Sequence, residues 1–167
     1  MSRAKTAQPS EVAARAEHVE ASYFRRFLTD VPSDDRDRLG IRSAMRREGV
    51  LTAMRDDPSG YWTKALGFWD STPLSRDDLR AVVRFFEESG AARGRVAIAP
   101  WVLPKEWGVW IEEEGLGRAG GWSKFVCDVE DLKPGRTDLP IRELVDGDLT
   151  QWTDLVRTQL LLSLIHI

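Results

Sequence analysis

The sequence predicts an α+β (mixed α/β) fold in which helices flank a mixed β-sheet. Two segments carry apolar residues at three- and four-residue steps, the spacing of a helix with one apolar face. Short segments rich in small or branched residues lie between them, bounded by glycine and proline, and are typical of strands. The chain has 167 residues, of which 42% are hydrophobic and 31% are charged. This length and composition suffice for a domain with a core of its own.

The first expected element is a helix that ends before Pro32. Its apolar residues fall on one face at helical spacing: Val12, Ala16, Val19, Tyr23, Phe27 and Leu28. Residues 1–10 are polar and show no such periodicity. We expect a flexible N-terminal tail over residues 1–20, followed by a compact unit over residues 21–132.

A hairpin follows, with strands expected at residues 41–47 and 50–54. The turn is placed at Glu48-Gly49, because glycine adopts the positive φ that a tight turn requires. After a stretch of turn formers, the apolar run from Tyr61 to Trp69 is compatible with either a strand or a short helix.

The second long helix is expected to begin at a capping box, Ser75-Arg76-Asp77-Asp78, whose first and last side chains satisfy free backbone N–H groups. Gly90 follows the last turn, as a C-terminal cap does. The buried stripe of this helix is expected to consist of Leu79, Val82, Val83 and Phe86. A strand over residues 95–99 comes next and ends at Pro100.

Pro104 suits the first turn of a further helix, which Gly115 ends. The apolar stripe of this helix consists of Trp107, Trp110 and Ile111. A strand from Trp122 to Val129 is expected to join the same sheet as the earlier strands. On that strand Cys127 is interpreted as a small buried hydrophobe rather than a nucleophile.

Residues 133–138 have the polar composition, broken by proline and glycine, of a linker. Beyond it we expect a strand over residues 139–144 and a helix with the apolar face Leu149, Trp152, Leu155 and Val156. One strand and one helix cannot enclose a core, so residues 139–161 are interpreted as the start of a second, truncated unit. Residues 162–167 resemble the translation of a mosaic-end adaptor from transposon-based sequencing libraries and are interpreted as an artefact.

Charge and cysteine content argue against several classes of function. The chain carries 24 Lys and Arg against 27 Asp and Glu, without the basic stripe that nucleic-acid binding requires. Its one cysteine permits neither an internal disulfide nor a zinc site built on cysteine pairs. There is no run of 18 apolar residues and no signal-peptide pattern. We expect a cytoplasmic protein with no nucleic-acid, membrane or metal partner.

Taken together, residues 20–160 resemble bacterial GNAT-type N-acetyltransferases built from two tandem units, the first degenerate and the second catalytic. The resemblance of the first unit rests on Leu39-Gly40-Ile41, Trp62 to Phe68, Phe85 to Gly90, Val96 to Pro100 and Trp110 to Leu116. Residues 121–132 resemble that unit's closing strand. Residues 139–144 and the helix after them resemble the opening of the catalytic unit.

The resemblance implies the N-terminal part of an enzyme that transfers an acetyl group from acetyl-CoA to an amine of a small molecule or peptide. In this family a loop of the form (Arg/Gln)-x-x-Gly-x-(Gly/Ala) follows a central strand and opens a helix, where backbone N–H groups bind the pyrophosphate. The glycine-containing residues 93–95 and 117–121 join a helix to a strand, which is the reverse order. Where the family often places a proton-donating tyrosine, this sequence has Ile111, which donates no proton. We therefore expect no catalytic or cofactor-binding residue in the first unit, and expect the acetyl-CoA loop to lie beyond residue 167.

Three of the seven tryptophans are candidate substrate-binding residues. Trp62, Trp69 and Trp101 flank turns or strand ends, where an aromatic ring lines a groove between sheet and loop. They also support an alternative function, a non-catalytic module that binds a small molecule or a peptide through this tryptophan-lined edge.

Overall fold

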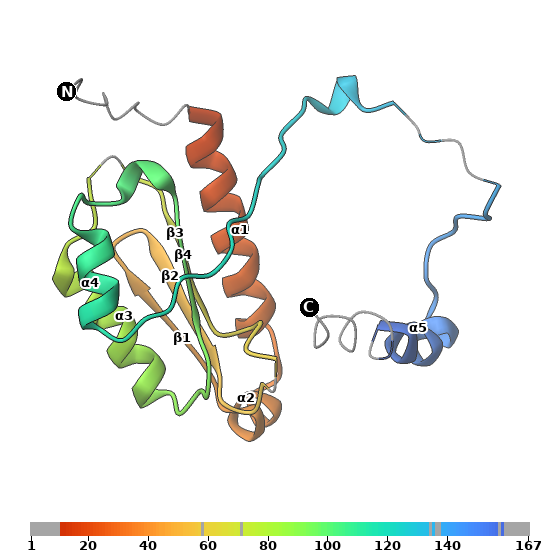
Figure 1. Cartoon of the computed structure of the whole chain (residues 1–167). Helices are drawn as coiled ribbons and strands as arrows, with labels where there is room; N and C mark the ends of the chain where they lie inside the picture. The colour runs from red at the N-terminus through yellow and green to blue at the C-terminus, as the bar shows by residue number, and fades with distance from the viewer. Residues whose placement is uncertain are drawn as a thin grey trace. The chain divides into compact units, whose positions relative to one another are not determined.

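The chain has the mixed α+β fold that its sequence predicts. The structure, a computed structural model, describes residues 11–57, 59–70, 72–133, 135, 138–156 and 158. The chain divides into two compact units, Met1–Val126 and Cys127–Ile167. The elements of the first unit are α1 (Glu11–Thr29), α2 (Ser33–Leu39), β1 (Ile41–Arg46), β2 (Gly49–Met54), β3 (Lys64–Phe68), α3 (Arg76–Glu88), β4 (Arg95–Ile98), a 3-10 turn (Pro100–Val102) and α4 (Trp107–Glu113) (Figure 1).

The strands of the described residues form one four-stranded sheet in the order β1-β2-β3-β4. β1 and β2 pair antiparallel, as do β2 and β3, whereas β3 and β4 pair parallel. The expected strands over residues 41–47, 50–54 and 95–99 are therefore confirmed and share one sheet. The run from Tyr61 to Trp69 contains β3, one of the two interior strands, which is buried along its whole length.

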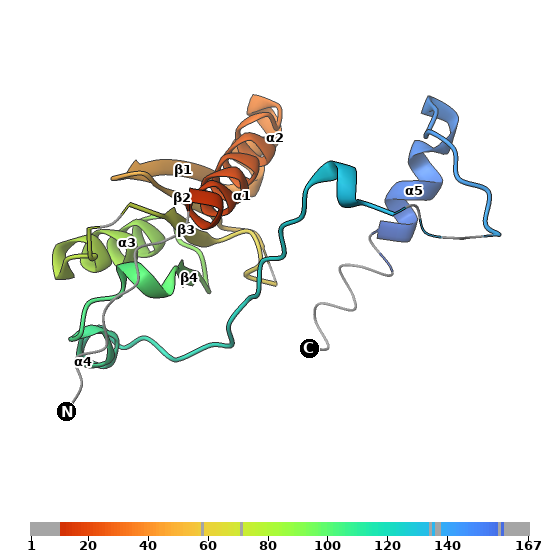
Figure 2. The ribbon, with the colours of Figure 1, turned by 90° about the horizontal axis from the view of Figure 1, so that it is seen from above.

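Helices cover both faces of this sheet (Figure 2). Because side chains alternate between the two faces of a strand, neighbouring residues of β2 and β3 contribute to different clusters. The cluster on the α1 face consists of Ala21, Phe24, Val50 and Leu66. The cluster on the α3 face consists of Leu51, Ala65, Phe68, Leu74, Val82, Ala99 and Val102.

Helix α1 corrects two of the sequence-based expectations. It begins at Glu11, so the flexible tail drawn over residues 1–20 is wrong for residues 11–20, and residues 1–10 lie outside the described part of the chain. The helix also presents a different face to the sheet than its pattern predicts. Its buried residues are Ala21, Phe24 and Leu28. Four of the six residues of the predicted stripe are exposed: Val12, Val19, Tyr23 and Phe27.

A bulge in β3 explains why α1 turns this face to the sheet. Ala65 pairs with Val96 and Phe68 with Ile98, so β3 carries one extra residue against β4. Within this bulge Gly67 has a φ of +79°, and a Cβ placed on it would lie 2.3 Å from the Cβ of Ala21. The helix therefore approaches the strand closely through a small residue. The bulge also turns Phe68 to the α3 face instead of the α1 face.

The β1–β2 turn lies one residue earlier than expected. Arg46 pairs with Gly49, which leaves Arg47-Glu48 as the turn. The positive φ, 54°, falls on Arg47 and not on a glycine. Gly49 instead meets a packing requirement, because a Cβ there would lie 2.5 Å from the Phe68 ring.

The expected helices after β3 are confirmed. Ser75 and Asp78 form the capping box of α3, and Gly90 follows it with a φ of 68°. α4 ends before Gly115, which has a φ of 70°, and buries Ile111. α2 is an additional short helix that no apolar pattern indicates, since none of its residues is buried.

The expected strand from Trp122 to Val129 is not formed. Residues 117–128 have no regular secondary structure, Trp122 is 68% exposed, and Cys127 is exposed rather than buried. Lys124 explains the path of this segment within the first unit, because its ammonium pairs with Glu17 and Glu20 of α1 at 2.6 Å each. The segment is thus held by ion pairs to a helix and makes no ladder with β4.

The second unit contains two 3-10 turns (Val129–Asp131 and Asp146–Asp148) and helix α5 (Leu149–Leu155). The helix confirms the sequence pattern, and its residues Leu149, Trp152 and Leu155 are exposed. The expected strand over residues 139–144 is not formed, because these residues lack a partner strand in the described part of the unit. The proposed adaptor-derived residues 162–167 lie outside the described residues.

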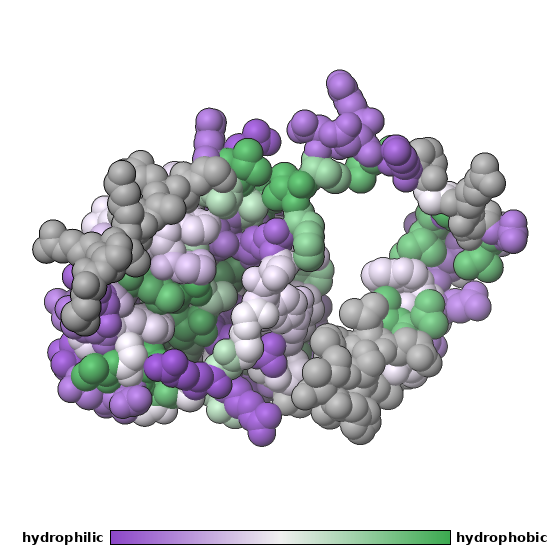
Figure 3. All heavy atoms as spheres, turned by 45° about the horizontal axis from the view of Figure 1, so that its top comes forward, coloured by the Kyte–Doolittle hydropathy of each residue, from purple (hydrophilic) through white to green (hydrophobic). Residues whose placement is uncertain are grey.

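Apolar side chains reach the surface of both units (Figure 3). None of the helices that the structure describes combines the length and the apolar character needed to cross a membrane.

Candidate functional site

The carboxyl ends of the parallel strands β3 and β4 meet at one edge of the sheet, which is where ligands bind in sheets of this kind. Trp69 directly follows β3, and Trp101 lies in the 3-10 turn after β4. The Trp101 Nε1–H donates a hydrogen bond of 3.5 Å to the backbone carbonyl of Trp69. Two of the three candidate substrate-binding residues therefore lie together at this edge.

Trp62 lies apart from these two, because it precedes β3 whereas Trp69 follows it. Its ring stacks on Phe27 of α1, with ring centroids 4.7 Å apart and an interplanar angle of 5°. Tyr61 contacts it edge-on at 5.1 Å. The three tryptophans therefore do not line one groove, and Trp62 belongs to an aromatic cluster between α1 and the start of β3.

Trp69 has an unsatisfied hydrogen-bond donor. Its Nε1 is cut off from solvent and makes no hydrogen bond. The indole lies edge-on to the His18 ring, with the centroids 6.0 Å apart. A buried indole N–H without an acceptor costs about 1–3 kcal/mol, so the position of Trp69 is destabilising in this respect.

The connection from β3 to α3 has the position that a pyrophosphate loop requires, since it follows a strand and opens a helix. Residues 69–75, which form it, contain no glycine. Glycines let the backbone come close to phosphate oxygens, so this connection lacks that property. The sequence pattern alone does not identify this connection as strand-to-helix, because the run from Tyr61 to Trp69 is compatible with either a strand or a short helix.

Side chains of the chain itself occupy the N-terminus of α3. The Ser75 hydroxyl accepts a hydrogen bond of 3.1 Å from the backbone N–H of Asp78, and the Asp78 carboxylate accepts one of 3.1 Å from the N–H of Ser75. Asp77 adds a second carboxylate to the first turn. Two negative charges at the positive end of the helix disfavour a bound anion.

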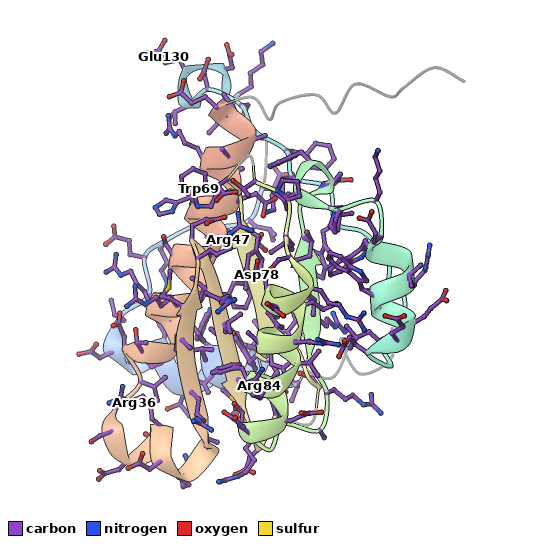
Figure 4. The ribbon with its side chains drawn as sticks, turned by 90° about the vertical axis from the view of Figure 1, so that its left-hand side faces the viewer. Arg36, Arg47, Trp69, Asp78, Arg84 and Glu130 are labelled. Carbon is purple, nitrogen blue, oxygen red and sulfur yellow. The ribbon has the colours of Figure 1, made fainter. Side chains whose placement is uncertain are left out.

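Arg47 fixes this connection to the β1–β2 turn (Figure 4). Its guanidinium donates to the Asp70 carboxylate at 2.5 Å and to the carbonyl of Thr72 at 2.9 Å. Burial raises the pKa of Asp70, but the hydrogen bond from Arg47 and a backbone N–H outweigh it and hold the pKa below its usual value. The charge of Arg47 is therefore already paired inside the chain.

Asp78 is paired in the same way. Arg46 donates to its carboxylate at 2.7 Å, and Arg47 lies 3.6 Å away. Burial raises the pKa of Asp78, whereas the hydrogen bonds from Ser75 and Arg46 lower it, and the lowering dominates. At this edge Arg46 and Arg47 are both paired with carboxylates of the chain itself. Neither guanidinium is therefore left unpaired to bind a phosphate.

A second feature lies at the opposite end of β3, where Lys64 is surrounded by aromatic rings. Its Nζ lies 3.6 Å from the ring centroid of Tyr61, 4.3 Å from that of Phe24 and 5.4 Å from that of Trp122. The residue is 7% exposed. Burial lowers the pKa of Lys64 to about 8. Sequence analysis missed Lys64, although a lysine inside the apolar run from Tyr61 to Trp69 is the signal that indicates it.

No group of three or more His, Cys, Asp or Glu side chains that could hold a metal ion lies within the described ranges. The sequence matches no family model, no curated protein and no solved structure, so the geometry of these two ends of β3 is the basis for assigning a function.

Proposed function

We propose that this chain is the non-catalytic, N-terminal part of an acetyl-CoA-dependent N-acetyltransferase of the GNAT type, which acts on an amine of a small molecule or peptide. One observation carries the proposal. Strand β3, helix α3 and the parallel strand β4 follow one another in a mixed sheet flanked by helices. A mixed sheet flanked by helices is the fold that the sequence resemblance implies, and the connection from β3 to α3 has the strand-to-helix order of the family's pyrophosphate loop.

The details of this connection support a unit without catalytic activity. Acyl transfer from a thioester needs groups that hold the pyrophosphate, polarise the carbonyl and move protons. Residues 69–75 contain no glycine, and Ser75 and Asp78 occupy the helix N-terminus. Ile111, in the place of a proton-donating tyrosine, is buried in α4 and donates no proton. Under this proposal the chemistry belongs to a second unit that opens at residue 139.

Calorimetric titration of this chain with acetyl-CoA tests the proposal. We expect no saturable heat at micromolar concentrations, because the anion-binding groups are paired internally. A micromolar dissociation constant would contradict the assignment of the first unit as non-catalytic.

The reading frame, extended through the source DNA, provides the positive half of the test. We expect it to encode an (Arg/Gln)-x-x-Gly-x-(Gly/Ala) loop. The extended protein should bind acetyl-CoA and acetylate an amine, and replacing the glycines of that loop should abolish both properties.

The alternative is a non-catalytic binding module, favoured by the edge that carries Trp69 and Trp101. At this edge the two indoles lie together, and the Nε1–H of Trp101 donates a hydrogen bond to the carbonyl of Trp69. A stop codon before any such loop in the extended frame would support this module and contradict the transferase.

A further inference from the structure

Strand β1 forms a free edge of the sheet. The strand order is β1-β2-β3-β4, so β1 has a partner strand on one side only (Figure 2). Its six residues, Ile41–Arg46, pair with β2 in one unbroken register. An edge strand carries a row of backbone N–H and C=O groups that a further strand can bind.

Three residues of β1 direct their backbone groups away from β2. A two-residue turn joins Arg46 to Gly49, and a turn of this kind carries a hydrogen bond between its first and last residues. From that pair, bonded and non-bonded pairs alternate along an antiparallel ladder. The residues whose N–H and C=O point outward are therefore Ile41, Ser43 and Met45. None of the three makes a backbone hydrogen bond outside the sheet to another described residue.

The described chain leaves this edge accessible from both faces of the strand. Ala44 packs against the cluster on the α3 face, so the side chain of Arg42 lies on that face and the side chains of Ser43 and Met45 lie on the α1 face. Arg42 and Ser43 are both exposed, and Met45 is 48% exposed. Neither face is therefore covered next to the outward backbone groups.

The opposite edge of the sheet, β4, is protected in ways that β1 is not. β4 has only four residues, and its ladder with β3 contains a bulge. Short strands and bulges are features that keep an edge from pairing with another chain. β1 is longer, and its ladder has no bulge. Of the two edges, β1 is the one suited to pairing between chains.

We propose that β1 pairs antiparallel with β1 of a second copy of this chain, about a two-fold axis at Ser43, so that the two sheets become continuous. In this register Ile41 of one copy lies opposite Met45 of the other, and Ser43 lies opposite Ser43. All of these residues have outward backbone groups, which supply the hydrogen bonds of the new ladder. Their side chains form two apolar pairs on either side of a small polar pair.

The arginines of β1 select this register. Outward-facing residues must meet outward-facing residues, so the second copy can move along the strand only in steps of two residues. One such step places Arg42 directly opposite Arg42, and a step in the other direction places it opposite Arg46. Like charges directly opposite each other destabilise a strand pair. The register about Ser43 places Arg42 opposite Ala44 instead.

The arginines that remain diagonal neighbours across the axis are bound within their own copy. Arg46 donates to the Asp78 carboxylate at 2.7 Å, and Arg42 donates to the backbone carbonyl of Glu88 at 2.7 Å. Both guanidinium groups are thus directed toward α3. The resulting pattern is symmetric about Ser43, which a two-fold contact between identical chains requires and a contact with an unrelated peptide does not. The second copy is therefore the partner that this edge fits.

Disulfide trapping tests the proposal on the intact chain. Ser43→Cys is made together with Cys127→Ser, which removes the chain's one native cysteine. Residues directly opposite each other in a bonded antiparallel pair have Cα atoms about 5.5 Å apart, a separation that a disulfide can span. Ser33→Cys in the same background, at an exposed position of α2, is the matched control.

Under mild oxidation we expect the Ser43→Cys chain to form a covalent dimer at least about ten times faster than the Ser33→Cys chain, because pairing raises the effective concentration of the two thiols. Equal rates of dimer formation would overturn the proposal. Because each copy contributes a single strand, the contact is small, and we expect a weak dimer whose population depends on protein concentration.

Sedimentation velocity measures the association without a cross-link. We expect the average mass of the wild-type chain to rise between micromolar and millimolar concentration. Ser43→Pro removes an outward N–H but no hydrogen bond to β2, and proline is tolerated on edge strands, so this variant should stay monomeric. Ser43→Ala keeps the N–H and should associate like the wild type.

Two results of sedimentation would contradict the proposal. A wild-type chain that stays monomeric throughout would show that a second copy does not occupy this edge, and association undiminished in Ser43→Pro would place the contact elsewhere on the chain. The urea midpoint of each variant, measured at micromolar concentration, shows whether it is folded. If the proline variant does not fold, the comparison of the two cysteine variants decides.

Discussion

At the scale of single residues, Arg47 joins the hairpin turn to the strand-to-helix connection. It does so in a left-handed backbone conformation that costs a non-glycine residue about 1 kcal/mol or more. The contacts to Asp70 and to the Thr72 carbonyl repay that strain. No motif in the sequence marks this role, because it depends on two turns that are distant along the chain.

Replacing this side chain should destabilise the first unit. Arg47→Ala removes charge-assisted hydrogen bonds, and we expect the free energy of unfolding to fall by about 1.5–3 kcal/mol in urea titrations. Arg38→Ala is the matched control, since it removes an exposed ion pair with Asp35 and should cost about 0.5 kcal/mol or less. Equal losses in the two variants would show that the Arg47 contacts add nothing to stability.

The two carboxyls near Arg47 make stability depend on pH. The pKa of Asp78, like that of Asp70, lies below its usual value in the folded chain, because hydrogen bonds from Ser75 and arginines outweigh the effect of burial. Their contribution is therefore fully present above the unfolded value of about 3.9 and is lost as the pH falls through the lower folded values. The urea midpoint should drop as the pH is lowered from about 5 to about 2, and Asp78→Asn should flatten this dependence. A variant with the wild-type slope would exclude Asp78 as a source.

At the scale of elements, the bulge in β3 determines how α1 meets the sheet. Gly67→Ala places a methyl group 2.3 Å from the Cβ of Ala21 at a φ of +79°. Both the clash and the backbone strain should destabilise the unit, by about 2–4 kcal/mol in total.

A double-mutant cycle separates the two causes. Ala21→Gly removes the atom that the new methyl group meets but leaves the strain at residue 67. We expect Gly67→Ala to cost about 1 kcal/mol less in the Ala21→Gly background, measured by urea unfolding. Strict additivity of the two substitutions would mean that the close approach of α1 to β3 is unimportant.

For some elements, the local sequence pattern alone is sufficient to predict the structure. The capping box and apolar stripe predict α3, because every signal for it is local. The stripe of α1 predicts a helix but not its buried face, since that face depends on a close approach to Gly67. The strand expected from Trp122 to Val129 fails because Lys124 binds acidic residues of α1, a contact between distant segments.

The residues of the candidate site also divide into those that the local sequence identifies and those that it does not. The positions of Trp69 and Trp101 at strand ends are readable from the sequence, and the structure brings them together. Trp62 has the same local signature but lies at the other end of β3. A lysine inside an apolar run signals Lys64 in the sequence, but the rings around its ammonium could not be identified there, because Phe24 and Trp122 come from distant segments.

At the scale of the whole molecule, every buried residue of the described chain lies between Ala21 and Ile111. The first unit therefore has its core within its own sequence. Deleting residues 139–167 should leave its melting temperature nearly unchanged. The deletion also removes the exposed Leu149, Trp152 and Leu155, so solubility should improve, as measured by the protein that remains in solution after concentration. A large fall in melting temperature would show that these residues belong to the first unit.

The parallel pairing of β3 and β4 has a consequence for the order in which the chain folds. The β1–β2 and β2–β3 pairs join residues close in sequence, whereas Ala65 and Val96 meet across the whole of α3. Closing that longer loop costs more chain entropy and brings no reward until α3 has packed. The three antiparallel strands should therefore assemble early, and the carboxyl-end edge with Trp69 and Trp101 should form last. Partly folded chains would have the antiparallel strands in place before this edge exists.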